Sequence, residues 1–184
     1  AGTSVRRNLL ENKNSIEIFR PEVKFVNGRL FDVTHLTLKE LELYFPLEFE
    51  LITKYKSYAI IRDPQKRFMS AIAQRLKMYD QKLIEELSKK EIEQYANNIL
   101  NILERLNCDG SFPHDMVHFT PQHSYIYFNN KQIINFISST DDLVSLYKEW
   151  GFSDYTMNNS IENSSAVVKS RARRIFITLY IKYL

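Results

Sequence analysis

The chain has 184 residues, of which 44% are hydrophobic and 26% are charged, and a globular chain of this length and composition can bury a full core. Its single cysteine, Cys108, excludes an internal disulfide and a metal site built from several cysteines. The net charge of +3 is too small to indicate a nucleic-acid partner, and no apolar run approaches the roughly 18 residues that span a membrane.

The first part of the chain predicts short strands and helices. The earliest expected elements are a polar helix over 4–13 and strands near 16–19 and 30–34. Thr37 and Glu40 have the spacing of a capping box, so a helix is expected to begin at about residue 38. The run 57–61 is rich in β-branched and aromatic residues, which predicts a buried strand.

The remainder of the chain continues the alternation. A helix is predicted over 64–79, because Pro64 suits a first turn and Phe68, Ile72 and Leu76 share one face. The expected elements after it are a helix opened by the capping box Ser88–Glu91, a loop over 107–124, a buried strand over 133–137, a helix starting near 139, and a helix over about 166–184. Such alternation indicates an α/β fold around a mainly parallel sheet.

An arginine lies where the predicted strand 57–61 gives way to a helix. Arg62 would then stand at the carboxyl edge of the sheet, where open α/β sheets bind ligands. Its planar guanidinium can bind a phosphate through two hydrogen bonds, and Ser70, two helical turns on, could bond the same anion. The alternative is structural: Arg62 would pair with a carboxylate, and Ser70 would be a small packing residue.

The segment from Tyr58 to Ala71, Tyr-Ala-Ile-Ile-Arg-Asp-Pro-Gln-Lys-Arg-Phe-Met-Ser-Ala, resembles the 3′-phosphate-binding motif of carbohydrate-type sulfotransferases. That motif has an apolar strand, Arg-Asp-Pro, an arginine three residues after the proline, and Ser-Ala. The resemblance implies that Arg62 and Ser70 hold the 3′-phosphate of 3′-phosphoadenosine 5′-phosphosulfate, with support from Arg67. It also implies a P-loop NTPase-like three-layer domain, with a mainly parallel central sheet flanked by helices.

The first residues resemble the end of the same family's 5′-phosphosulfate loop. Gly2 would let backbone N–H groups approach the anion, while Thr3 and Ser4 would add hydroxyl donors at a helix N-terminus. A plain helix N-cap explains Thr3 or Ser4 equally well. The family's first strand and its loop lysine would precede Ala1. The expectation is therefore a single domain over 1–184 that lacks that strand and the start of the loop.

His35 is the candidate general base. It immediately precedes the helix opened by Thr37, and the positive end of a helix favours the neutral imidazole that a base requires. Relatives that act on polysaccharides have a catalytic histidine at a similar distance before Arg-Asp-Pro, so the resemblance implies this role for His35. A histidine that only satisfies local backbone groups is the alternative.

A second histidine segment runs from His118 to Gln122 and resembles a His-x-x-Pro-Gln sequence of several carbohydrate sulfotransferases. In those enzymes the sequence belongs to a loop beside the active site. The resemblance implies that His118 or Gln122 contacts the substrate or the nucleotide. An ordered loop without such a contact is the alternative.

The sequence thus predicts a sulfotransferase that moves a sulfuryl group from 3′-phosphoadenosine 5′-phosphosulfate to a hydroxyl, expected on a saccharide, without a metal and without a nucleic-acid partner. Composition favours a bacterial-like cytoplasmic enzyme, and a membrane-anchored Golgi type remains the alternative. A P-loop nucleotide kinase or other phosphotransferase would need a Walker loop and an acidic magnesium ligand. A non-catalytic anion- or glycan-binding module would need a basic stripe or an aromatic platform.

Overall fold

The computed structural model describes residues 22–106 and 112–149. Their backbone contacts divide them into two compact units, the first of residues 22–62 and 121–149 and the second of residues 63–106 and 112–120. The elements expected at 4–13, 16–19 and 166–184 lie outside the described residues. A single domain over 1–184 stays a prediction.

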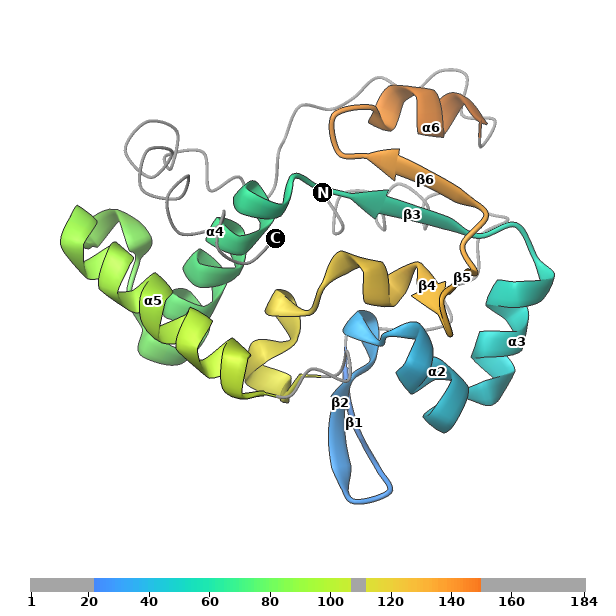
Figure 1. The fold of residues 1–184 in the computed structure, drawn as a ribbon, viewed down its shortest axis with the longest axis horizontal. Helices are drawn as coiled ribbons and strands as arrows, with labels where there is room; N and C mark the ends of the chain where they lie inside the picture. Colours follow the sequence, from blue (N-terminus) through green and yellow to red (C-terminus); the bar gives the residue numbers. More distant parts are fainter. Residues whose placement is uncertain (1–21, 107–111, 150–184) are drawn as a thin grey trace. The chain divides into compact units, whose positions relative to one another are not determined.

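The first unit begins with a β-hairpin (Figure 1). Strand β1 (Val23–Val26) pairs antiparallel with β2 (Arg29–Asp32). Asn27 and Gly28 both have positive φ, 49° and 80°, as the tight turn of a two-residue hairpin requires. β2 is the strand expected near 30–34, whereas its partner β1 was not predicted, although Asn-Gly between two apolar runs is a strong hairpin signal.

Two helices follow the hairpin, α2 (Leu38–Tyr44) and α3 (Pro46–Lys54). The predicted capping box is confirmed: the Thr37 hydroxyl accepts from the Glu40 backbone N–H at 3.2 Å, and the Thr37 N–H donates to the Glu40 carboxylate at 2.9 Å. Both side chains are buried. The box therefore fixes the start of α2 within the core of the unit.

A parallel strand pair is the second sheet of this unit (Figure 1). Strand β3 (Tyr58–Ile61) pairs with β6 (Phe136–Ser139), and α6 (Leu143–Glu149) follows β6. β3 is half-buried rather than fully buried. The strand expected at 133–137 begins three residues late, because Ile134 enters the core at 6% exposure while Phe136 and Ile137 are 37% and 40% exposed.

The third pair is antiparallel and joins β4 (Tyr127–Phe128) to β5 (Lys131–Gln132). The described residues therefore form a mixed α/β structure with small sheets, one parallel and two antiparallel. One hydrophobic core joins several segments of this unit. Its buried residues are Phe31, Val33, Leu36, Leu38, Leu41, Phe45, Ile126 and Ile134, and Ala59 and Ile61 of β3 pack against them.

The second unit is helical. Helix α4 (Pro64–Arg75) continues into a single π turn, η2 (Leu76–Asp80), so the helix expected over 64–79 is regular only to Arg75. The elements that follow are η3 (Ile84–Glu86), α5 (Lys89–Arg105) and the 3-10 helix η4 (His114–Phe119). The capping box at Ser88–Glu91 is confirmed at the start of α5. The loop expected over 107–124 thus contains η4, and η5 (Gln122–Tyr125) in the first unit.

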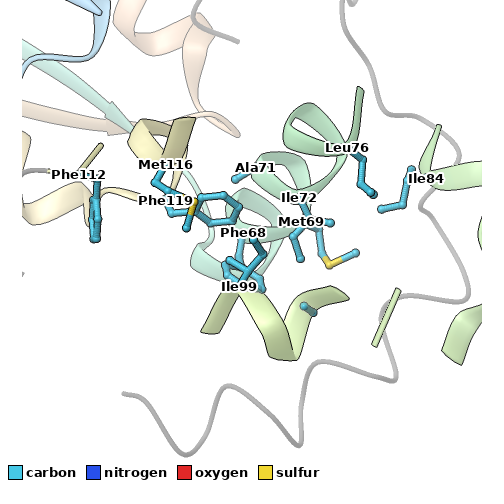
Figure 2. Packing of buried hydrophobic residues seen from close by; sticks show 11 residues of the cluster. Phe68, Met69, Ala71, Ile72, Leu76, Ile84, Ile99, Phe112, Met116 and Phe119 are labelled. Carbon is cyan, nitrogen blue, oxygen red and sulfur yellow. The ribbon is translucent and has the colours of Figure 1, made fainter. Parts of the chain in front are cut away.

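The core of the second unit lies between α4, α5 and η4 (Figure 2). Phe68, Ile72 and Leu76 are all buried, which confirms the predicted inner face of α4. The ring of Phe68 packs edge-on against Phe119, with centroids 5.5 Å apart. Arg75, at the end of α4, donates to the hydroxyl of Tyr95 and to the carboxylate of Asp115, each at 3.0 Å. Apolar burial and one arginine therefore hold these helices together.

Among the helices of residues 22–106 and 112–149, none combines the length and the apolar character that crossing a membrane requires.

Candidate functional site

Arg62 lies directly after β3, at the carboxyl end predicted for it. The carbonyl of Ile61 accepts from the Thr140 N–H at 2.9 Å, which extends the β3–β6 pairing to the last residue of β3. The next residue, Arg62, bonds through both backbone groups to the Gln122 side chain. Its N–H donates to Gln122 Oε1 at 2.8 Å, and its carbonyl accepts from Gln122 Nε2 at 2.7 Å. Both backbone hydrogen-bonding groups of the residue from which the guanidinium extends are therefore bound to one side chain.

Asp63 caps the N-terminus of α4, the helix that follows Arg62. Its carboxylate accepts from the Lys66 N–H at 2.8 Å, and its carbonyl accepts from the Arg67 N–H at 2.9 Å. An Asp in this position is a standard N-cap, and Pro64 suits the first helical turn. Because the Asp63 carboxylate already accepts from the Lys66 N–H, an anion bound nearby would not use that backbone donor.

Arg67 and Ser70 both belong to α4 in the second unit. They are three residues apart, so they lie on neighbouring turns of one side of the helix. Both side chains are half-buried. The structure thus gathers two of the three residues expected at the 3′-phosphate on one helix, and Arg62 precedes that helix by two residues.

His35 is the last residue of a 3-10 turn, η1 (Val33–His35), which Asp32 caps. Its Nδ1 lies 2.9 Å from Asp32 Oδ2 and 3.0 Å from the hydroxyl of Thr34. An imidazole that donates Nδ1–H to a carboxylate keeps its lone pair on Nε2. This tautomer is the one required of a general base that acts through Nε2. The His35 side chain is 34% exposed, compared with 21% for Asp32.

The Asp32 carboxylate is held in its ionised form. Burial by itself would raise the pKa of Asp32, but hydrogen bonds from His35 and Thr34 outweigh it and hold that pKa well below its usual range. Thr34 contributes through its hydroxyl at 2.6 Å and its backbone N–H at 3.1 Å. An ionised carboxylate beside Nδ1 both orients the ring and stabilises the imidazolium that forms when Nε2 takes up a proton.

The segments that carry His35, Arg62 and Gln122 share one hydrophobic core. Val33 and Leu36, which flank His35 within one turn, are buried in the cluster that Ile61 packs against. Ile126, at the end of η5, is buried in the same cluster, and α2 contacts η5. Three stretches far apart in the sequence are therefore fixed within one unit, and each carries a residue that the sequence marked as functional.

The remaining predicted residues fall elsewhere. His118 is a half-buried residue of η4 and belongs to the second unit, whereas Gln122 belongs to the first. The His-x-x-Pro-Gln sequence therefore runs across the boundary of the two units. Gly2, Thr3 and Ser4 lie outside the described residues.

Asp32 is the functional candidate that sequence reasoning missed. The sequence does contain a signal for it, because an aspartate three residues before a histidine can cap a turn and hydrogen-bond to the imidazole ring. The same signal explains why residues 33–35 form a 3-10 turn: Asp32 accepts from the Thr34 N–H and satisfies a donor at its start. The pairing of Gln122 with Arg62 carried no comparable local signal.

Comparisons of the chain with protein-family models, with curated proteins and with solved structures find no match.

Proposed function

We propose that this chain is a sulfotransferase that transfers the sulfuryl group of 3′-phosphoadenosine 5′-phosphosulfate to a carbohydrate hydroxyl, on a P-loop-like three-layer fold. The observation that carries the proposal is the position of Arg62. It directly follows β3 of the parallel pair β3–β6 and leads into α4, within the segment that resembles a 3′-phosphate motif. Anionic ligands of open α/β sheets bind at this carboxyl edge.

In this proposal the donor is held by its two anionic ends. Arg62, Arg67 and Ser70 would bind the 3′-phosphate, since a guanidinium fork and a hydroxyl offer the donors that a phosphate accepts. Gly2, Thr3 and Ser4 would bind the 5′-phosphosulfate. His118 would contact the substrate or the nucleotide. A cytoplasmic location belongs to the same proposal and rests on composition alone.

The chemical step needs a base at the acceptor. Nε2 of His35 would take the hydroxyl proton while the acceptor oxygen forms its bond to sulfur. The bond from sulfur to the bridging oxygen of the donor breaks, and adenosine 3′,5′-bisphosphate leaves with that oxygen. The Asp32 carboxylate, 2.9 Å from His35 Nδ1, would stabilise the imidazolium. As in phosphoryl transfer, positioning and charge stabilisation would supply most of the catalysis.

Calorimetry with adenosine 3′,5′-bisphosphate and adenosine 5′-phosphate tests the donor site. We expect the bisphosphate to bind more tightly, because only it carries the 3′-phosphate. Hydrogen bonds to charged groups contribute about 1.5–3 kcal/mol, so Arg62→Ala should weaken the bisphosphate by about 10- to 150-fold. The control is Arg105→Ala, which removes the same charge from an exposed position at the end of α5 and should leave binding unchanged.

The result that refutes the proposal is equal affinity of the wild-type protein for the two nucleotides. Tight ATP binding with magnesium-dependent phosphate transfer would instead identify a phosphotransferase. A preference for the 3′-phosphate without sulfuryl transfer to any saccharide offered would identify a binding module. Transfer is followed with donor carrying a radiolabelled sulfuryl group.

A further inference from the structure

The side chain of Gln122 bonds to both backbone groups of one residue, sixty positions earlier in the chain. Gln122 Oε1 accepts from the Arg62 N–H at 2.8 Å, and Gln122 Nε2 donates to the Arg62 carbonyl at 2.7 Å. Both distances are at the short end for N–H···O hydrogen bonds. A neighbouring strand would pair with the N–H and C=O of one residue in the same way.

The position of these two hydrogen bonds relative to β3 and β6 shows which part of the backbone they hold. Backbone groups of successive strand residues point to opposite edges. Because the Ile61 carbonyl bonds to Thr140 on the β6 side, the groups of Arg62 point to the other edge. Gln122 occupies that edge at Arg62. It therefore fixes the backbone at the point where β3 has ended and the cap of α4 has not yet begun.

Gln122 is itself firmly placed. It opens η5, in which the Ser124 N–H donates to the Pro121 carbonyl at 3.1 Å and the Ile126 N–H donates to the His123 carbonyl at 2.9 Å. Ile126 is 5% exposed and lies in the core of the first unit. The amide that holds Arg62 is thus anchored by a short helical turn and a buried side chain.

We propose that Gln122 is a positioning residue of the 3′-phosphate site, acting through the Arg62 backbone rather than by touching nucleotide or acceptor. The inference rests on the proposed function. Fixing the backbone of residue 62 fixes the direction in which its side chain leaves the strand. A guanidinium held in its binding direction loses less conformational entropy when the phosphate arrives. Removing the two bonds should therefore weaken binding of the 3′-phosphate selectively.

Gln122→Met tests this, since it keeps the length of the side chain and removes both polar atoms. We expect the variant to bind adenosine 3′,5′-bisphosphate about tenfold more weakly than the wild type, with adenosine 5′-phosphate affected less than about twofold. Gln132→Met is the matched control. Gln132 Nε2 donates to the Ile134 carbonyl at 2.8 Å in the same unit, so this change removes a similar bond away from Arg62 and should leave both affinities unchanged.

Hydrogen exchange of the Arg62 amide, followed by NMR, provides a readout that needs no ligand. That amide should exchange faster in Gln122→Met than in the wild type or in Gln132→Met. If Gln122→Met does not fold, Gln122→Asn keeps the amide but is one methylene too short for both bonds, and we expect the same selective loss.

The possible failures are distinguishable. A wild-type protein without preference for the bisphosphate refutes the proposed function and this inference with it. A wild type that prefers the bisphosphate, together with a Gln122 variant that keeps the full preference, refutes the inference alone. An equal loss of both nucleotides in the variant also refutes it, because a general structural defect would have that effect.

Discussion

Replacing Asp32 by asparagine should separate the contribution of its negatively charged carboxylate from the contribution of its side-chain size. Asparagine has nearly the same size, so the turn at 33–35 can persist. Its amide can present a donor to His35 Nδ1, now 2.9 Å from Asp32 Oδ2. The ring would then accept at Nδ1 and carry its proton on Nε2, which is the wrong tautomer for a base. The variant would also lose the negative charge that stabilises the imidazolium.

The size of the effect follows from the exposure of the pair. General-base catalysis contributes about 10²–10⁴-fold, and a fully buried Asp–His pair can lose about 10⁴ when the carboxylate becomes an amide. Here the side chains of His35 and Asp32 are 34% and 21% exposed, so water can replace part of the lost interaction. We therefore expect kcat to fall by about 10²–10³-fold, or about 2.7–4 kcal/mol of activation free energy.

The assay measures transfer of a radiolabelled sulfuryl group to a saccharide acceptor, together with calorimetric binding of adenosine 3′,5′-bisphosphate. Asp32→Asn should lower kcat and leave the nucleotide affinity unchanged. Asp115→Asn is the control, because its carboxylate also pairs with a side-chain donor, Arg75, at 3.0 Å, but in the second unit. It should keep wild-type kcat. Unchanged turnover in Asp32→Asn, or an equal loss in both variants, would remove Asp32 from the mechanism.

Two further predictions concern stability. The pKa of Asp32 is lower in the folded protein than in the unfolded chain. Ionised Asp32 therefore adds to the free energy of unfolding above the ordinary aspartate pKa of about 4, and this contribution decreases as the pH falls below that value. The difference in unfolding free energy between wild type and Asp32→Asn, measured in urea, should therefore shrink between about pH 6 and pH 3; a constant difference contradicts the shift. Thr37→Ala should lower the free energy of unfolding by about 2 kcal/mol, and Ser88→Ala should lower it by about 1 kcal/mol or less. The difference is expected because the first capping box is buried and the second is exposed. Equal losses for the two variants in urea unfolding would contradict this reasoning.

Local patterns in the sequence predicted most of the individual elements. Both capping boxes were predicted, because a hydroxyl and a carboxylate three residues apart satisfy each other's backbone donors without help from the rest of the chain. The inner face of α4 was predicted because its apolar residues recur at helical spacing. The expected mainly parallel sheet is confirmed only in part, because β3 pairs in parallel with β6 whereas the other two pairs of the described residues are antiparallel. These features depend on residues close in sequence or on a general rule of topology.

The errors arose where tertiary contacts decide between similar local patterns. The run Ile133–Ile137 is apolar on both sides of Asn135, so its hydrophobic pattern does not show which end pairs with a strand and which end enters the core. The structure buries Ile134 and pairs Phe136, because Asn135 bonds to Ser57 and sets the register of β6 on β3. The hairpin strand β1 was missed for a different reason: its Asn-Gly turn was a recognisable signal that the sequence interpretation did not use.

The candidate site shows the same division between local and long-range information. Asp32 and His35 are three residues apart, so their pairing follows from a turn that an aspartate can cap, and a closer reading of the sequence could have found it. Gln122 and Arg62 are sixty residues apart, and their pairing exists only because η5 and β3 pack on one core. The side-chain amide of Gln122, for which a ligand contact was expected, bonds to the backbone of Arg62, another candidate residue. The sequence can therefore indicate which residues belong near a site, whereas the division into groups that contact ligand and groups that position them depends on hydrogen bonds formed after folding.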